Sequence, residues 1–216
     1  MKVGKLFARG DMAAVALAMF AGTARADGML GQPVYKAGDV AARFVGSEAV
    51  YGDDLYFFLT IGQFGDAQFL FDNHATTPGA FMDVNDDGLA LGDEVLFGIC
   101  VRRDGTSPEP GCPAADDVFY SGDGSRNADN MPHMIVWTRE EYMALTGTNL
   151  DDLGIGAEYD YVIGFEDILG GGDEDYNDAV FAVRGVTTVP EPLTMTLLAT
   201  GLAGMGGASA LKRRRK

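Results

Sequence analysis

Short strand-like segments separated by turn residues are the feature that most constrains the fold of this chain. Each run is rich in β-branched and aromatic residues, and clusters of Gly, Asp, Asn and Pro separate one run from the next. The predicted strands are 55–62, 67–71, 94–101, 117–121, 133–137, 159–165 and 179–186, with 33–37 and 42–46 as two further candidates. Many short strands with little helix predict an all-β fold, an antiparallel and jelly-roll-like β-sandwich.

One segment has helical character. Residues 138–147 carry Thr138 as a candidate N-cap, and Glu141 follows three residues later in the pattern of a capping box. We therefore expect one short helix beside the strands.

The region between the two ends of the chain is acidic. Residues 27–188 hold 7 of the 16 basic residues and 30 of the 32 acidic ones, so their net charge is −23. Aromatic and β-branched residues are too frequent there for a disordered segment, and the length suits one domain. Nucleic acid and anionic membranes need neutralising Lys or Arg, so neither is an expected partner.

The first 26 residues have the pattern of a secretory signal peptide. A basic start precedes the apolar run 12–24, and Ala24-Arg25-Ala26 supplies small residues for cleavage before Asp27. The alternative is an uncleaved N-terminal anchor. The signal-peptide interpretation predicts export.

The last 28 residues combine a short motif, an apolar span and a basic tail. Val189-Pro190-Glu191-Pro192 precedes residues 193–211, which carry no charge and would reach roughly 28 Å as a helix, enough to cross a membrane. Residues 212–216 are all basic and would stay in the cytoplasm. This order resembles the PEP-CTERM sorting signal of Gram-negative bacteria. The resemblance implies an inner-membrane intermediate, recognition by an exosortase at Pro190, Glu191 and Pro192, and delivery to the cell surface or an extracellular matrix.

The two cysteines, Cys100 and Cys112, lie at the ends of a predicted hairpin loop. In an oxidising compartment they are expected to form a disulfide, and two free thiols are the alternative. Neither a Cys-x-x-Cys nor a His-x-x-x-His spacing accompanies them, so a zinc site is not expected.

An acidic loop is predicted between the last two strands. Six carboxylates fall within residues 166–178, and three glycines at 170–172 allow tight folding. Such a density of like charge needs either water or a cation among the carboxylates. Hard oxygen donors at this spacing suit Ca²⁺, and a solvated loop is the alternative. The candidate calcium ligands are Glu166, Asp167, Asp173, Asp175, Asn177 and Asp178.

A second acidic segment precedes the predicted strand 94–101. Asp83, Asn85, Asp87 and Glu94 match the ligand positions of an EF-hand loop. An EF-hand needs a helix on each side, and neither flank is helical in character. A calcium loop on a β scaffold is a weaker candidate here, and a plain turn is favoured.

The segment "IGFEDILGGGDEDYNDAVFAV" resembles the signature of a bacterial surface domain of unknown function, number 4114. The segments "LFDNHATTPG", "EVLFGICV" and "GSRNADNMPH" also resemble that domain, so the likeness spans roughly residues 55–186. Such domains occur in PEP-CTERM proteins and in calcium-rich, adhesin-like proteins. The resemblance implies no particular activity.

Two functions compete at this stage. The first is a non-catalytic, calcium-stabilised surface module that contacts exopolysaccharide or another component of the surface matrix. The second is a secreted glycoside hydrolase that uses two carboxylates among Glu166, Asp167, Asp173 and Asp175. Since the sequence has no Gly-x-Ser-x-Gly, His-Glu-x-x-His or P-loop pattern, we expect a protein that is not an enzyme.

Overall fold

The computed structural model describes residues 28–106, 112 and 115–189. Its strands are β1 (Met29–Leu30), β2 (Val34–Gly46), β3 (Gly52–Phe58), β4 (Gln68–Asp72), β5 (Phe81–Asp83), β6 (Glu94–Arg102), β7 (Asp117–Tyr120), β8 (Met134–Thr138), β9 (Tyr161–Phe165) and β10 (Ala179–Thr187). The helices are α1 (Arg139–Thr146) and three 3-10 turns, η1 (Phe64–Asp66), η3 (Gly124–Arg126) and η4 (Leu150–Leu153).

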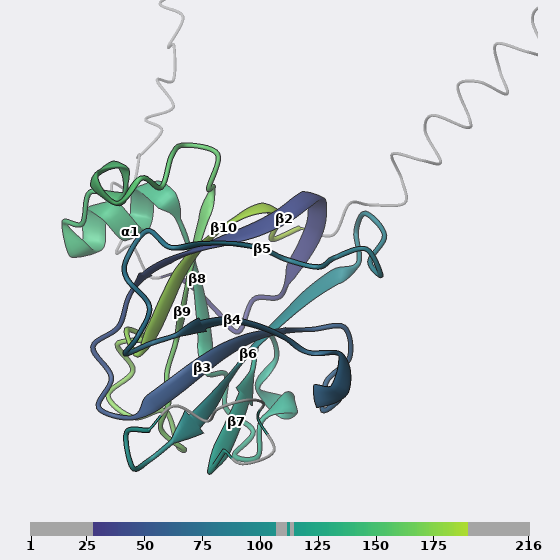
Figure 1. Ribbon diagram of the computed structural model, residues 1–216, viewed down its shortest axis with the longest axis vertical. Helices are drawn as coiled ribbons and strands as arrows, with labels where there is room; N and C mark the ends of the chain where they lie inside the picture. Colours follow the sequence, from purple (N-terminus) through teal and green to yellow (C-terminus); the bar gives the residue numbers. More distant parts are fainter. Residues whose placement is uncertain (1–27, 107–111, 113–114, 190–216) are drawn as a thin grey trace, which may run out of the picture.

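The strands pair antiparallel throughout and form two groups (Figure 1). One group has the order β1-β8-β9-β10-β2, with β5 also on β2, and the other joins β4, β3, β6 and β7. Only two residue pairs, Val34 with Val95 and Tyr35 with Glu94, connect β2 of the first group to β6 of the second. The two groups are therefore joined by a short pairing, and the sheet is open.

A shared hydrophobic core lies between the two strand groups. Leu55 of β3 and Ile99 of β6 belong to the same buried cluster as Ile163 of β9. Phe97 of β6 meets Phe181 of β10 with ring centroids 5.0 Å apart. This packing supports the predicted all-β, sandwich-like class, whereas the jelly-roll-like connectivity stays a prediction.

Helix α1 and the segment after it cover the outer face of β8, β9 and β10. Tyr142 of α1 packs in a second buried cluster with Trp137 of β8 and Val162 of β9. The predicted capping box is confirmed, because the Thr138 side chain accepts from the Glu141 backbone and the Glu141 side chain accepts from the Thr138 backbone. This helix thus begins where the sequence predicts.

Several strand boundaries differ from the prediction. The expected strand 55–62 instead begins at Gly52 and ends at Phe58, so it includes Asp53 and Asp54. Every residue of β3 is buried because the strand lies between β4 and β6 and packs against a cluster on each face. Acidic residues are rare in strands, and rarer in buried ones, so the sequence pattern predicts a start after Asp53 and Asp54.

The two candidate strands 33–37 and 42–46 are one continuous strand, β2. Strand β10 follows β2 across an irregularity between Arg184 and Val186. Gly185 has φ 74° there, and a side chain would collide with the backbone carbonyl of Asp39. The polar residues in the middle of β2 therefore mark an irregular pairing and not a loop.

The terminal predictions lie outside the described residues. These are the signal peptide 1–26, the sorting motif Pro190, Glu191 and Pro192, the apolar span 193–211 and the basic tail 212–216. Among the residues that the structure describes, no helix is long and apolar enough to cross a membrane.

Candidate metal centre

The acidic loop connects β9 to β10 at the end of their hairpin. Glu166 and Asp167 follow β9 directly, and Asp178 immediately precedes β10. Phe165 pairs with Ala179, so Asp167 and Asp178 are brought together although eleven residues separate them. The Asp178 carboxylate accepts a hydrogen bond of 2.9 Å from the Asp167 backbone N–H. The strand register therefore fixes the base of the loop.

Carboxylate oxygens converge in two overlapping groups. In each group the candidate ligand atoms lie within 4.8 Å of one another. The first group joins Glu166 with Asp167 and Asp178, and the second joins Glu166 with Asp173 and Asp175. Five of the six predicted ligands thus come together around Glu166.

The sixth predicted ligand, Asn177, lies at the edge of the cluster. Its side-chain amide donates to Asp175 at 2.7 Å and to Glu48 at 3.4 Å. The Asn177 side chain therefore links the carboxylates of Asp175 and Glu48.

Three carboxylate oxygens in this region are buried without a partner. Glu166 and Asp167 are only 1% and 3% exposed. Among the described residues, no hydrogen bond reaches Glu166 Oε2, Asp167 Oδ2 or Asp53 Oδ1. An uncompensated buried carboxylate oxygen is costly, because it has lost water without gaining a donor. A bound cation would supply the missing interaction.

Asp53 is a member of this region that the sequence did not indicate. It lies on β3, is 1% exposed and exchanges hydrogen bonds with Asn73. Burial raises its pKa well above the ordinary value, and the charges of Asp167 and Asp178 raise it further. Only the packing of β3 beside the β9–β10 hairpin brings this carboxyl to the cluster.

Burial and mutual repulsion shift the loop carboxyls strongly. Burial, followed by the neighbouring charges beginning with Asp178, raises the pKa of Glu166 to about 8. Burial and the charge of Asp178 raise the pKa of Asp167 to about 7. Burial also raises the pKa values of Asp175 and Asp178. Within the described residues, these groups need protons or a cation to offset their charge.

The glycine run folds the loop over Glu166. Gly170, Gly171 and Gly172 all have positive φ, at 85°, 86° and 51°. A side chain at Gly172 would collide with the Glu166 carboxylate. Glycine at this position therefore permits the close approach of loop backbone and ligand.

A buried histidine immediately before β8 anchors the same loop. His133 stacks on Phe119 with ring centroids 3.8 Å apart, and its Nδ1 lies 2.9 Å from the Glu166 carbonyl oxygen. Its Nε2 lies 2.8 Å from Asp129, which also accepts from Gly170 N–H at 2.8 Å. Burial alone raises the pKa of Asp129, but these hydrogen bonds outweigh it and lower the value to about 2. Both ring nitrogens are thus engaged in positioning the loop.

An open cleft of about 490 Å³ gives access to the cluster. Its lining includes Glu166, Asp167 and Asp178 of the acidic loop, together with Val50 and Tyr51, which immediately precede β3. The cleft thus opens the edge of the cluster to solvent.

The second acidic segment has a different structure. Asp83 ends β5, Asn85 and Asp87 are exposed, and none of the predicted residues there joins a group of converging carboxylates among the described residues. Glu94 instead receives two hydrogen bonds from Arg126, at 2.6 and 2.8 Å. This arrangement favours the plain-turn interpretation.

The buried acid of that segment is Asp86, which was not among the predicted ligands. Its carboxylate accepts from Val40 N–H at 3.1 Å and pairs with the Lys36 ammonium at 3.1 Å. Lys36 also donates to the carbonyl oxygens of Asp86 and Leu89, at 2.9 and 3.0 Å. The oxygens of this loop therefore surround a cation that the chain itself provides.

Cys100 and Cys112 are joined as a disulfide in the structure, with their Cα atoms 5.4 Å apart. Both are buried, in a cluster with Tyr56, Phe58 and Tyr120. The bond closes the hairpin after β6, far along the chain from the acidic loop.

Residues 91–186 match the family model described as "Domain of unknown function (DUF4114)". The match runs from just before β6 through most of β10 and includes the whole acidic loop, whereas Asp53 and Lys36 precede it. The resemblance noted in the sequence is thus supported over this part of the chain. No curated protein and no solved structure matches the chain.

Proposed function

We propose that this protein is an exported, non-catalytic surface module whose β9–β10 hairpin is stabilised by a bound Ca²⁺ ion. The observation that carries the proposal is the pair of unpartnered, buried oxygens on Glu166 and Asp167, at the centre of two converging carboxylate groups. A divalent cation there replaces the repulsion among the carboxylates with attraction.

The donor set favours calcium over softer metals. All members of the two groups are carboxylates, and Ca²⁺ takes six to eight oxygen ligands with flexible geometry. The nearby His133 has both ring nitrogens engaged, so it is not free to bind zinc or copper. Mg²⁺ competes poorly because it gives up its water reluctantly.

Export rests on the ends of the chain and on the disulfide. Disulfides persist in oxidising compartments outside the cytoplasm. The signal-peptide pattern and the resemblance of residues 189–216 to a PEP-CTERM segment agree with export and with processing by an exosortase. We propose delivery through the inner membrane to the cell surface or matrix, where exopolysaccharide is a candidate partner.

One observation favours a glycoside hydrolase as the second candidate. The pKa of Glu166 is raised to about 8, as a general acid requires. However, Glu166 is only 1% exposed, and the other carboxyls around it are shifted in the same direction. A hydrolase needs one protonated and one ionised carboxyl facing a sugar, so this environment suits a cation better.

Direct binding measurements separate the two candidates. The mature domain, stripped with EDTA and dialysed, is titrated with CaCl₂ in a calorimeter, alongside Glu166→Gln and the exposed-site control Asp152→Asn. We expect saturable binding by the wild type and the control, and its loss in Glu166→Gln. Release of reducing sugar from polysaccharide by calcium-free protein, without calcium binding, would establish the hydrolase instead.

A further inference from the structure

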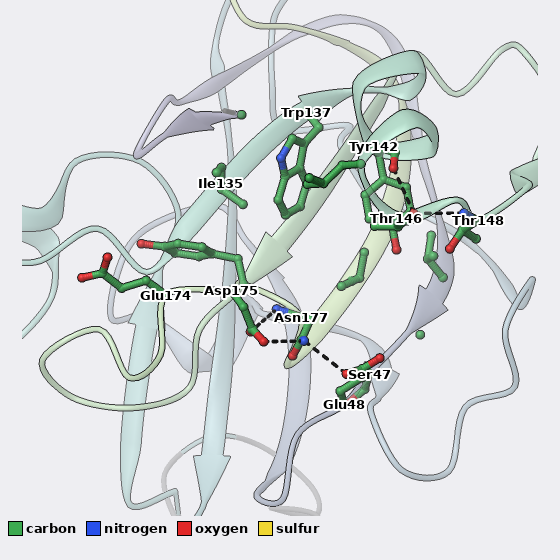
Figure 2. A pocket seen from close by; sticks show the side chains of 16 residues that line it. Ser47, Glu48, Ile135, Trp137, Tyr142, Thr146, Thr148, Glu174, Asp175 and Asn177 are labelled. Atoms are coloured by element: carbon green, nitrogen blue, oxygen red, sulfur yellow. Dashed lines mark hydrogen bonds between the residues drawn. The ribbon is translucent and has the colours of Figure 1, made fainter. Parts of the chain in front are cut away.

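A second cavity lies on the outer face of the sheet, next to the cation cleft. Its volume is about 690 Å³, which falls in the range of small-ligand sites. The end of β2, strand β8, helix α1 and residues 174–177 line it (Figure 2). We call this cavity the aromatic pocket; it shares one carboxylate, that of Asp175, with the proposed calcium site and is otherwise separate from it.

One wall of the aromatic pocket is made of fixed aromatic rings. Trp137 and Tyr142 lie with ring centroids 5.6 Å apart. The indole of Trp137 is held by close contact with two glycines, because a side chain at Gly28 or Gly164 would collide with it. Tyr176 adds a third ring and has the unusual φ of 56°. Trp137, Tyr142 and Tyr176 are only 4%, 8% and 7% exposed, so they form a fixed apolar wall that reaches the pocket with a small part of its surface.

The facing wall is a row of polar side chains. Figure 2 shows Asp175, Asn177 and Glu48 across the pocket from Trp137 and Tyr142, joined by hydrogen bonds through the Asn177 amide. Asp175, Asn177 and Glu48 also line the cation cleft, so they form a partition between the two cavities. A ligand in the aromatic pocket meets two carboxylates that are already positioned.

The charge of the lining selects the ligand class. Glu48, Glu174 and Asp175 are acidic, and among the described residues that line the pocket none is Lys, Arg or His. The carboxylates of the neighbouring cluster outnumber the two charges of a Ca²⁺ ion, so the potential stays negative with the metal bound. Anionic ligands are repelled, and a cation gains more than a neutral molecule.

We propose that the aromatic pocket binds the side chain of a lysine or arginine on a basic peptide or protein partner. The alkyl part of such a side chain packs beside Ile135 and Leu145, and its charged end lies between the aromatic rings and the carboxylates of Glu48 and Asp175. Charge-assisted hydrogen bonds to these carboxylates then hold the charged end, and the mostly buried rings give the side chain an apolar wall. This site goes beyond the calcium proposal and does not require it.

The single tryptophan of the chain provides the assay, because Trp137 lines the pocket. The probe is a tetralysine peptide with blocked ends, and the matched control is the same peptide with acetylated side chains. We expect a saturable change in fluorescence with the first peptide and none with the second. The same titration is carried out in EDTA and in CaCl₂, so that the proposal for the pocket and the proposal for the calcium site are tested separately.

Two variants separate binding in the pocket from general attraction to an acidic surface. Glu48→Gln removes one exposed pocket carboxylate and should weaken binding about fivefold, the upper range for an exposed ion pair. Asp152→Asn makes the same charge change outside the pocket and should leave the affinity nearly unchanged. Equal effects of the two variants, equal binding of the acetylated peptide, or saturation by maltotetraose in place of tetralysine would overturn the proposal.

Discussion

The two acidic loops of this protein look alike in sequence but are neutralised in different ways. In the loop 83–94 the chain supplies its own cations, since Lys36 bonds to Asp86 and Arg126 bonds to Glu94. In the loop 166–178 no ion pair to a Lys or Arg is found among the described residues, and buried oxygens lack partners. Carboxylate spacing alone therefore does not identify a metal site, because a long basic side chain can take the place of the metal.

The largest expected effect is the response of the unsatisfied loop to pH. Glu166 has a raised pKa of about 8, so the metal-free folded state holds a proton that the unfolded state releases near its ordinary pKa of 4.5. The folded state therefore binds more protons in this window, and the free energy of unfolding must fall as pH rises from 4.5 to about 8. For Glu166 alone, this pKa shift corresponds to a decrease in the free energy of unfolding of at most on the order of 5 kcal/mol.

Urea unfolding of EDTA-treated protein at pH 5, 6, 7 and 8 measures this slope. Glu166→Gln should make the slope smaller, because the neutral amide does not titrate, while the part that arises from Asp167 and its neighbours remains. CaCl₂ should flatten the slope of the wild type by compensating the ionised carboxylates. A wild-type slope equal to that of Glu166→Gln would show that the Glu166 carboxyl is not held protonated by its surroundings.

The next largest effect concerns Lys36 of β2, whose ammonium group pairs with Asp86 in the loop 83–94. Lys36→Met leaves the Asp86 carboxylate nearly buried and unpaired, and it should lower the free energy of unfolding by about 3 kcal/mol. The control is Arg103→Met, which breaks an exposed ion pair with Asp117 and should cost less than about 1 kcal/mol. Chemical denaturation measures both, and a cost for Lys36→Met no greater than the control would mean that this ammonium does not hold the loop.

Calcium itself should stabilise one loop and not the other. At calcium a hundredfold above its dissociation constant, binding to the folded state adds about 2.7 kcal/mol, which raises the melting temperature by roughly 5–10 °C. Glu166→Gln should abolish the rise, whereas Asp87→Asn, in the loop 83–94, should keep it. If both variants retain the full response, the ion binds elsewhere.

The smallest effect is expected from the carboxyl that joins the cluster through β3. Asp53→Asn keeps the size of the side chain and removes a buried charge that faces Asp167 and Asp178. The EDTA-treated variant should gain about 1 kcal/mol at pH 8, since repulsion falls, and its stabilisation by calcium should shrink. Asp152→Asn should change neither quantity in the same melting experiments. If Asp53→Asn is as stable as the wild type both with and without calcium, Asp53 is not part of the site.

Local patterns in the sequence predicted the parts of the fold that depend on neighbouring residues. The β-rich class, the capping box of Thr138 and Glu141, and the acidic loop between the last two strands all follow from interactions within a few residues. The convergence of Asp167 and Asp178 also follows once 159–165 and 179–186 are recognised as a hairpin. These features needed no knowledge of the rest of the chain.

Which charges meet depends on the packing of distant segments. Lys36 reaches Asp86 across fifty residues, and Arg126 reaches Glu94 across thirty-two. Asp53 belongs to the acidic cluster because β3 packs beside the β9–β10 hairpin. The physical reason is that burial and Coulomb energy depend on distances in space, and the pairing of distant strands sets those distances. The positions of the acidic loops can thus be read from the local sequence, whereas the fold sets which of the two loops still needs a cation.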